Sequence, residues 1–206
     1  MLVRALSTVA LVCATLGAAI VFEAASKTAG ALDMIVSAKA SQSPVVQGQL
    51  LARAEASLRD SWAHPTLWHA GAAEALSGVY LLDAQITSDP QLYAESVRWA
   101  EASIRRAPVQ PHAWTRLALL SDAGYPNTLC DVADCLTNSW HVAAMMDPET
   151  ECLRLQLAHR HQLLLPRDPR IGAFLRSGVS RRRAAQCLSF LPPQDLYELM
   201  MDAAAR

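Results

Sequence analysis

Helical periodicity interrupted by prolines is the feature of this sequence that most constrains its fold. Apolar residues recur at helical spacing, as at Val46, Leu50 and Ala54, while polar residues occupy the other side of the predicted helix. The step Asp89-Pro90 places a capping side chain directly before a proline at the first helical position. No stretch shows the strand alternation with Asn-Gly or Asp-Gly turns that is typical of hairpins. The sequence therefore predicts an all-α fold.

Composition excludes two broad classes of protein. Hydrophobic residues make up 52% of the 206 residues and charged residues only 18%, which is too apolar for a disordered chain. The chain has 18 Lys and Arg against 19 Asp and Glu, so it lacks the basic excess of a nucleic-acid-binding protein. We therefore expect a folded helical chain with no nucleic-acid partner.

The N-terminus carries an apolar run that resembles a membrane signal. Residues 5–22 contain no charged side chain and lie between Arg4 and Glu23. A bilayer crossing needs about 20 apolar residues, and a basic residue before the run favours a cytoplasmic N-terminus. We expect residues 1–23 to form a signal anchor and residues 24–44 a linker or helical extension. Cleavage of the segment is the alternative, because small residues follow at Ala24, Ala25 and Ser26.

The remainder is expected to form one repeat domain and a C-terminal cap. Over residues 45–165 we expect helices that begin near Val46, Pro65, Pro90, Pro111, Asp131 and Pro148. Over residues 166–206 we expect capping helices that begin near Asp168, Ser180 and Pro192.

Two of these helices share the pattern Pro-x-x-Trp, at Pro65 and Trp68 and again at Pro111 and Trp114. Each partner helix ends shortly before a proline that begins the next unit. The residues that carry the repeat are Trp68, Ala72, Ala100, Pro108, Pro111, Trp114, Leu117, Ala118, Trp140, Ala143 and Pro148.

This pattern resembles the tetratricopeptide repeat, in which a Trp, a small residue and a closing Pro recur along paired antiparallel helices. The spacings from Pro65 to Pro111 and from Pro108 to Pro148 exceed the family's period of about 34 residues, so the repeats would carry longer loops. The resemblance covers residues 45–165. It implies stacked helix pairs with a shared core and a concave surface that holds a peptide or protein segment.

The cysteines offer a candidate disulfide between Cys130 and Cys135. Their Cα atoms are too far apart within a regular helix, but a bridge forms if Cys130 lies in the preceding loop. The alternative is that both are small buried apolar residues. Cys152 and Cys187 could pair with each other or with one of the first two, and spacing does not decide this.

No motif indicates a metal site or catalysis. Cys152, His159 and His161 lie close in sequence, but neither a C-x2-C nor an H-E-x-x-H spacing is present. A G-x-S-x-G nucleophile motif is also missing, and the scattered carboxylates are typical of a solvated surface. We expect no metal, no cofactor and no enzymatic activity.

Two other groups of residues invite a binding interpretation. Arg181, Arg182 and Arg183 form a basic run that could contact an acidic polymer, a lipid headgroup or an acidic partner. The alternative is a solvated helix start. The tryptophans at positions 62, 68, 114 and 140 raise the question of sugar stacking, but two of them carry the Pro-x-x-Trp pattern, which favours packing in the core.

The resulting hypothesis is a non-catalytic scaffold or adaptor that faces a bacterial periplasm. Its N-terminal helix would cross the inner membrane once, and its partner would be an inner-membrane or periplasmic protein. The layout, including the stretch 96–108, is also similar to small membrane-anchored accessory proteins of bacterial surface-polysaccharide biosynthesis and export. The alternatives are an envelope-assembly chaperone that binds exported polypeptides and a periplasmic glycan-processing enzyme.

Overall fold

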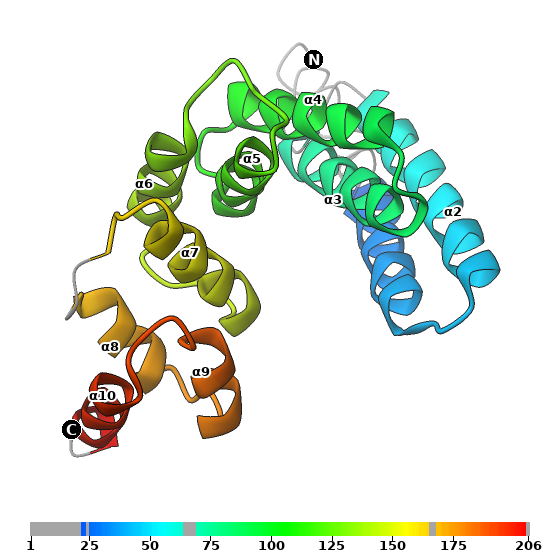
Figure 1. Ribbon diagram of the computed structural model, residues 1–206. Coiled ribbons are helices and arrows are strands. Elements are labelled where there is room, and N and C mark those ends of the chain that lie inside the picture. The colour runs from blue at the N-terminus through cyan, green and yellow to red at the C-terminus, as the bar shows by residue number, and fades with distance from the viewer. Residues whose placement is uncertain (1–21, 24, 64–68, 165–167, 205–206) are drawn as a thin grey trace, which may run out of the picture. The chain divides into compact units, whose positions relative to one another are not determined.

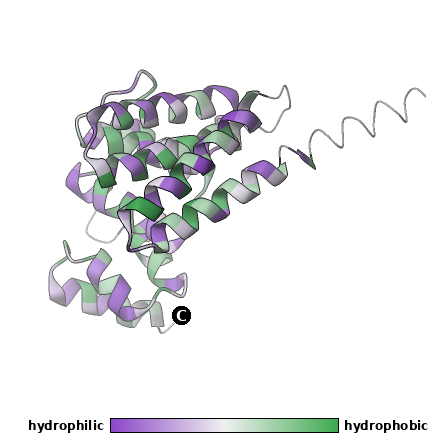
Figure 2. Cartoon of the chain, turned by 90° about the vertical axis from the view of Figure 1, so that its right-hand side faces the viewer, coloured by the Kyte–Doolittle hydropathy of each residue, from purple (hydrophilic) through white to green (hydrophobic). Residues whose placement is uncertain are grey.

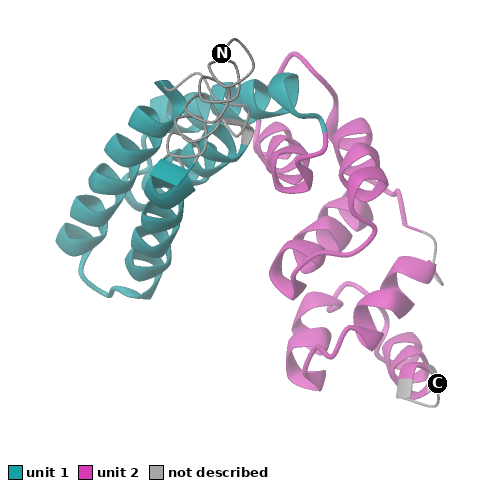
Figure 3. Cartoon of the chain, turned by 180° about the vertical axis from the view of Figure 1, so that it is seen from behind, with its two compact units in different colours: residues 1–108 teal, residues 109–206 magenta. Residues whose placement is uncertain are grey.

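The computed structural model describes residues 22–23, 25–63, 69–164 and 168–204. Within these ranges the fold is all-α and contains no strand, which confirms the predicted fold class. A helix over residues 25–40 precedes α2 (Pro44–Ala63), α3 (His69–Thr87), α4 (Pro90–Arg106), α5 (Pro111–Asp122), α6 (Val132–Val142), α7 (Pro148–Arg160), α8 (Pro169–Arg176), α9 (Arg181–Cys187) and α10 (Pro193–Ala204) (Figure 1). The chain divides into two compact units, residues 1–108 and 109–206, each of which is described by itself (Figure 3).

Aspartate caps begin several of these helices. The side chain of Asp89 accepts a hydrogen bond from the backbone N–H of Gln91 at 2.9 Å. Asp147 accepts from the N–H groups of Glu149 and Thr150, at 3.1 and 3.0 Å. Each cap satisfies backbone donors that the first helical turn leaves without a partner, so the Asp-Pro steps of the sequence begin helices here.

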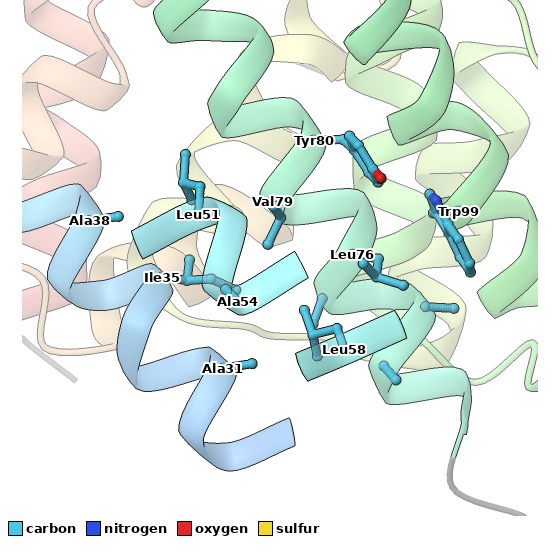
Figure 4. Packing of buried hydrophobic residues seen from close by; sticks show 13 residues of the cluster. Ala31, Ile35, Ala38, Leu51, Ala54, Leu58, Leu76, Val79, Tyr80 and Trp99 are labelled. Atoms are coloured by element: carbon cyan, nitrogen blue, oxygen red, sulfur yellow. The ribbon is translucent and has the colours of Figure 1, made fainter. Parts of the chain in front are cut away.

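Unit 1 is built around one apolar core. Side chains from residues 25–40 and from α2, α3 and α4 meet there, and Figure 4 shows ten of them by name. The buried members are Ala31, Ile35, Ala38, Leu51, Ala54, Leu58, Ala72, Ala73, Ala75, Leu76, Val79, Tyr80 and Trp99. Residues 24–44 were expected to act as a linker or helical extension. The structure forms a helix over residues 25–40 and places Ala31, Ile35 and Ala38 in this core, because they share one face of that helix.

Among α2–α10, the contact between α3 and α4 is the most extensive between any two helices. Two buried serines join them reciprocally. The hydroxyl of Ser77 donates to the carbonyl oxygen of Ser96, and the hydroxyl of Ser96 donates to the carbonyl oxygen of Ser77, both at 2.7 Å. Small side chains at both positions let the two backbones approach closely enough for these bonds, so polar groups are buried without loss of partners.

Unit 2 holds a second core, in which α7 contacts α8 and α9. Its buried members are Leu155, Ile171, Phe174, Ala184, Cys187 and Leu188. A disulfide between Cys152 of α7 and Cys187 of α9 joins elements that are 35 residues apart in sequence. Residues 166–206 thus belong to the same compact unit as α5–α7. The division after Pro108 falls inside the stretch 45–165 that was expected to form one domain.

The predicted location in a bacterial inner membrane is corrected by the structure. Across the described ranges, no helix combines the length and the apolar character that crossing a bilayer requires. The helix over residues 25–40 carries Lys27, Asp33 and Lys39, and Figure 2 shows hydrophilic and hydrophobic residues mixed along the helices. The expected span itself, residues 1–23, lies outside the described residues except for Phe22 and Glu23.

Candidate functional site

The residues of the expected repeat signature are packing residues wherever the structure describes them. Trp68 lies outside the described residues. The small side chains of Ala72, Ala100 and Ala118 are buried, and so is Leu117. The other members are the half-buried Trp114, Trp140 and Ala143, the helix-opening Pro111 and Pro148, and the exposed Pro108. None of these positions lines the hollows beside Cys130, beside Arg181 or beside His159.

The structure contains a disulfide between Cys130 and Cys135, the pair that the sequence singles out. Cys130 precedes the cap of α6 and Cys135 is buried within its first turns, with a Cα–Cα distance of 5.5 Å. The bridge is compatible with disulfide geometry because Cys130 lies in the loop rather than in the helix. The side-chain amide oxygen of Asn127 accepts from the backbone N–H of Cys130 at 3.0 Å and organises the same loop.

The basic run at 181–183 begins α9 and is exposed. Arg183 forms an ion pair with Glu149 at 2.7 Å, and its backbone N–H donates to the capping hydroxyl of Ser180. Arg181 also lines a small hollow of about 170 Å³ with apolar neighbours of α8 and α10. The three guanidinium groups therefore lie on a solvated helix start, and the described residues around them do not form an enclosed anion site.

The three metal-ligand candidates of the sequence are separated by other interactions. Cys152 is bound in a disulfide, and His159 stacks on Phe190 with ring centroids 4.2 Å apart. His161 contacts Asp122, with 2.8 Å between Nε2 and the carboxylate oxygen. In the part of the chain that the structure describes, no three His, Cys, Asp or Glu residues are grouped so that they could hold a metal ion.

A buried arginine organises the polar interior of unit 2. Arg154 of α7 and Glu151 one turn earlier are both 0% exposed, and their side chains pair at 3.1 Å. The guanidinium of Arg154 also donates to the carbonyl oxygens of Ala143 and Ser139, each at 2.9 Å, and to the hydroxyl of Thr115 at 3.2 Å. All its N–H groups thus have acceptors, as a buried charge requires.

Trp140 closes this network from α6. Its indole N–H donates to Glu151 at 3.0 Å. The acceptor is the carboxylate oxygen that does not pair with Arg154. The guanidinium of Arg170 lies 4.1 Å from the Trp140 ring centroid, while Asp168 binds Arg170 at 2.8 and 2.7 Å. Burial lowers the pKa of Arg154, and the charge of Glu151 opposes that shift. We name residues 115, 139, 140, 151 and 154 the Arg154 network.

Unit 1 contains a second meeting of arginine and tryptophan, this time at the surface. Trp62 of α2 and Trp99 of α4 pack edge to face, with ring centroids 5.6 Å apart. Arg59 and Arg98 lie over the Trp99 ring at 5.7 and 5.4 Å, and Arg106 lies over Trp62 at 5.4 Å. We name these five residues the arginine–indole surface. Cation–π contacts of this kind hold the guanidinium groups over the rings while their outer faces stay in solvent.

A phenol and a carboxylate border this surface. The hydroxyl of Tyr80 donates to Glu55 and accepts from Arg59, both at 2.5 Å, and Arg59 also donates to Glu55 at 2.8 Å. Burial and the adjacent Glu55 carboxylate raise the pKa of Tyr80 to about 12. Burial likewise raises the pKa of Asp83, together with the charges of Glu55 and Asp89. Acidic and basic groups thus alternate along the edge of the unit 1 core.

The indole N–H of Trp99 has no acceptor among the described residues, although the residue is only 8% exposed. Figure 4 shows the indole nitrogen on the side of the ring that faces Tyr80. A buried donor without a partner is rare in folded proteins and marks a position that calls for an explanation. The arginine–indole surface is therefore the candidate functional site of the described chain.

Sequence reasoning missed this site. Trp99 was not among the tryptophans considered, and neither Arg59 nor Tyr80 belongs to a known motif. Two local signals were present: Glu55 and Arg59 are one helical turn apart, and Arg98 directly precedes Trp99. These residues come together because α2 packs on α3 and α3 packs on α4, and the sequence does not show this packing.

Comparison of the chain with protein-family models, with curated proteins and with solved structures gives no match. The site must therefore be interpreted from its own geometry.

Proposed function

We propose that this chain is a non-catalytic helical adaptor that binds a partner protein through the arginine–indole surface of unit 1. The observation that carries the proposal is the placement of Arg59, Arg98 and Arg106 over the indoles of Trp62 and Trp99. Tryptophan and arginine are the residue types most enriched among the energetically dominant residues of protein interfaces. The two tryptophan rings, held on helices, offer contact area at a low cost in conformational entropy.

The rest of the described molecule supports a scaffolding role. The buried polar groups of α5–α7 bond to one another in the Arg154 network, and the α3–α4 contact includes the small buried side chains of Ser77 and Ser96. Such closely packed pairs are compatible with the tetratricopeptide-like arrangement expected from the sequence, which stays a prediction. The surface-polysaccharide context also stays a prediction from sequence layout.

Site-specific photocrosslinking tests the proposal. A benzophenone amino acid replaces Ala94, which is exposed one turn before Arg98 on α4, and a matched control replaces the exposed Gln186 of α9. In the native host we expect one discrete adduct from position 94 that disappears in Arg98→Glu/Arg106→Glu. The same adducts from both positions, or an adduct that survives the double substitution, would contradict an interface on this surface.

The partner identified by mass spectrometry is then purified and its affinity for the chain is measured. We expect the double substitution to weaken binding at least tenfold, because two surface anchors are lost. Equal affinity of the two forms would show that the crosslink reports proximity only.

A further inference from the structure

The unpartnered N–H of Trp99 indicates what the arginine–indole surface binds. This donor is buried, so water does not reach it freely, and no described residue supplies an acceptor. The neighbouring polar atoms do not serve, because the Tyr80 hydroxyl already donates to Glu55 and accepts from Arg59. A buried donor in this state is destabilising until an acceptor arrives.

The groups around the indole are donors as well. Arg59 and Arg98 both lie within 6 Å of the Trp99 ring centroid. Arg59 bonds to Glu55 through Nε and to Tyr80 through Nη2, and within the described chain its Nη1 has no hydrogen bond. Arg98 uses Nη2 for Glu95 at 2.6 Å. Three donor groups therefore converge on one indole, and the missing component is an oxygen that accepts from them.

The charges at the site favour a singly charged acceptor. The carboxylates of Glu55, Asp83 and Glu95 lie on the same three helices and offset the guanidinium groups of Arg59 and Arg98. Inorganic phosphate or a phosphate monoester, with its higher negative charge, would be repelled by these carboxylates more strongly than a singly charged group. One carboxylate, in contrast, accepts several hydrogen bonds at once and pairs with arginine in a planar, bidentate way.

The site is accessible through movement of arginine side chains. The side chains of Arg59 and Arg98 are 48% and 62% exposed, and exposed long side chains change rotamer readily. A change of the Arg98 rotamer opens the face of the Trp99 ring without moving any helix. The acceptor then enters beside the ring, reaches Nε1 and pairs with Arg98 in its new position.

We propose that the arginine–indole surface binds a glutamate or aspartate side chain of a partner protein, with one carboxylate oxygen accepting from Nε1 of Trp99 and the carboxylate pairing with Arg59 and Arg98. This inference rests on the proposed adaptor function and specifies the chemistry of the partner. In this inference, Trp99 requires the ligand to carry a hydrogen-bond acceptor, and Arg59 and Arg98 require that acceptor to be negatively charged.

Nuclear magnetic resonance of the full chain labelled with ¹⁵N-tryptophan tests the inference, because each indole N–H gives its own signal. The signal of Trp99 is assigned by triple-resonance spectra and checked with Trp99→Phe. The probe is an octapeptide that alternates Gly and Glu, acetylated and amidated so that its only carboxylates are side chains. Its control replaces every Glu with Gln.

We expect the Glu peptide to shift the Trp99 signal downfield in a saturable way, with smaller changes at the other indoles. The dissociation constant should rise about tenfold in Arg98→Gln and stay unchanged in Arg181→Gln, and raised ionic strength should weaken binding. A Trp99 signal that does not move, that moves equally with the Gln peptide, or that moves only with inorganic phosphate or anionic vesicles would overturn the inference.

The two proposals fail separately. If the Glu peptide leaves the Trp99 signal unchanged while the crosslink from position 94 still depends on Arg98 and Arg106, the adaptor function holds and carboxylate recognition is wrong. If the peptide binds but the crosslink is absent, the site recognises carboxylates without serving as the adaptor interface.

Discussion

Both units place arginine and glutamate side chains beside a tryptophan, but the arrangement is buried in unit 2 and reaches solvent in unit 1. In unit 2, Arg154 and Glu151 are fully buried, and the indole N–H of Trp140 donates to Glu151. In unit 1, Arg59 and Arg98 reach solvent, and the indole N–H of Trp99 has no described acceptor. A closed network of this kind holds helices together, whereas an open one leaves bonding capacity for another molecule. The comparison contrasts an arginine that joins helices with arginines that we propose bind a partner.

The largest effect is expected from breaking the closed network. Replacement of Arg154 with Ala leaves Glu151 as a buried charge and removes the donor from the carbonyl oxygens of Ser139 and Ala143 and from the hydroxyl of Thr115. Removal of one member of a buried ion pair costs about 3–5 kcal/mol. Urea unfolding should show this loss, while the matched variant Arg98→Ala should lose less than about 1 kcal/mol because its ion pair is exposed. Equal losses would mean that burial does not distinguish the two arginines.

The second prediction concerns the disulfides, both of which lie in unit 2 among the described residues. Cys152–Cys187 spans 35 residues and Cys130–Cys135 spans 5. The chain-entropy model gives about 4 kcal/mol for the longer loop and about 2 kcal/mol for the shorter one. Paired Cys→Ala variants, compared by thermal unfolding, should preserve this order.

Reduction of the two disulfides provides a control for the predicted order of their contributions to stability. A reducing agent should accelerate amide hydrogen exchange in α7 and α9, which Cys152–Cys187 connects, and should leave α3 and α4 of unit 1 unchanged. Faster exchange in α3 and α4 would show that the stability of unit 1 depends on the bridges of unit 2.

The third prediction tests the two indoles directly. Trp140→Phe and Trp99→Phe remove the same N–H and the same ring atoms, and each indole carries a stacked arginine. Only Trp140→Phe leaves a buried carboxylate oxygen of Glu151 without its donor. We expect Trp140→Phe to destabilise by about 1–3 kcal/mol more than Trp99→Phe in chemical unfolding. A larger loss at Trp99 would show that its N–H has an acceptor in solution.

The sequence predicted local structure, such as helices and their caps, better than it predicted contacts between helices. Local rules were sufficient for the all-α class and for the helix starts after Asp89, Asp147 and Asp168, because a cap and its helix are neighbours in the chain. The pairing of Cys130 with Cys135 was also accessible, since it depends only on where a loop ends.

Contacts between helices were not predictable in this way. The partners of Arg154 come from α5, α6 and α7, and the neighbours of Trp99 come from α2 and α3 as well as α4. Periodicity shows which residues lie on the apolar face of a helix, but it does not show which other helix packs against that face. The same limit applies at residues 24–44, where the sequence allowed a helical extension but did not predict that Ala31, Ile35 and Ala38 are buried in the unit 1 core.

The smallest expected effect is a loss of stability at alkaline pH, and it tests the contacts of Tyr80 beside the arginine–indole surface. The folded-state pKa of Tyr80 is raised to about 12, against 10.0 for an ordinary tyrosine. A raised pKa means that the unfolded chain loses its phenol proton first. The stability that Tyr80 contributes is therefore fully present below pH 10 and is lost as the pH rises from 10 toward 12.

Comparison of the chain with Tyr80→Phe isolates this contribution. Below pH 10 the variant should be less stable by about 1 kcal/mol, because the bonds to Glu55 and Arg59 are lost. The difference should shrink above pH 10, and tyrosinate absorbance should show one phenol of the parent chain that titrates near 12 and is missing in the variant. A difference that is constant with pH would mean that the Tyr80 hydroxyl faces solvent. The Glu55–Arg59–Tyr80 contacts would then not hold Arg59 in place beside the indole of Trp99.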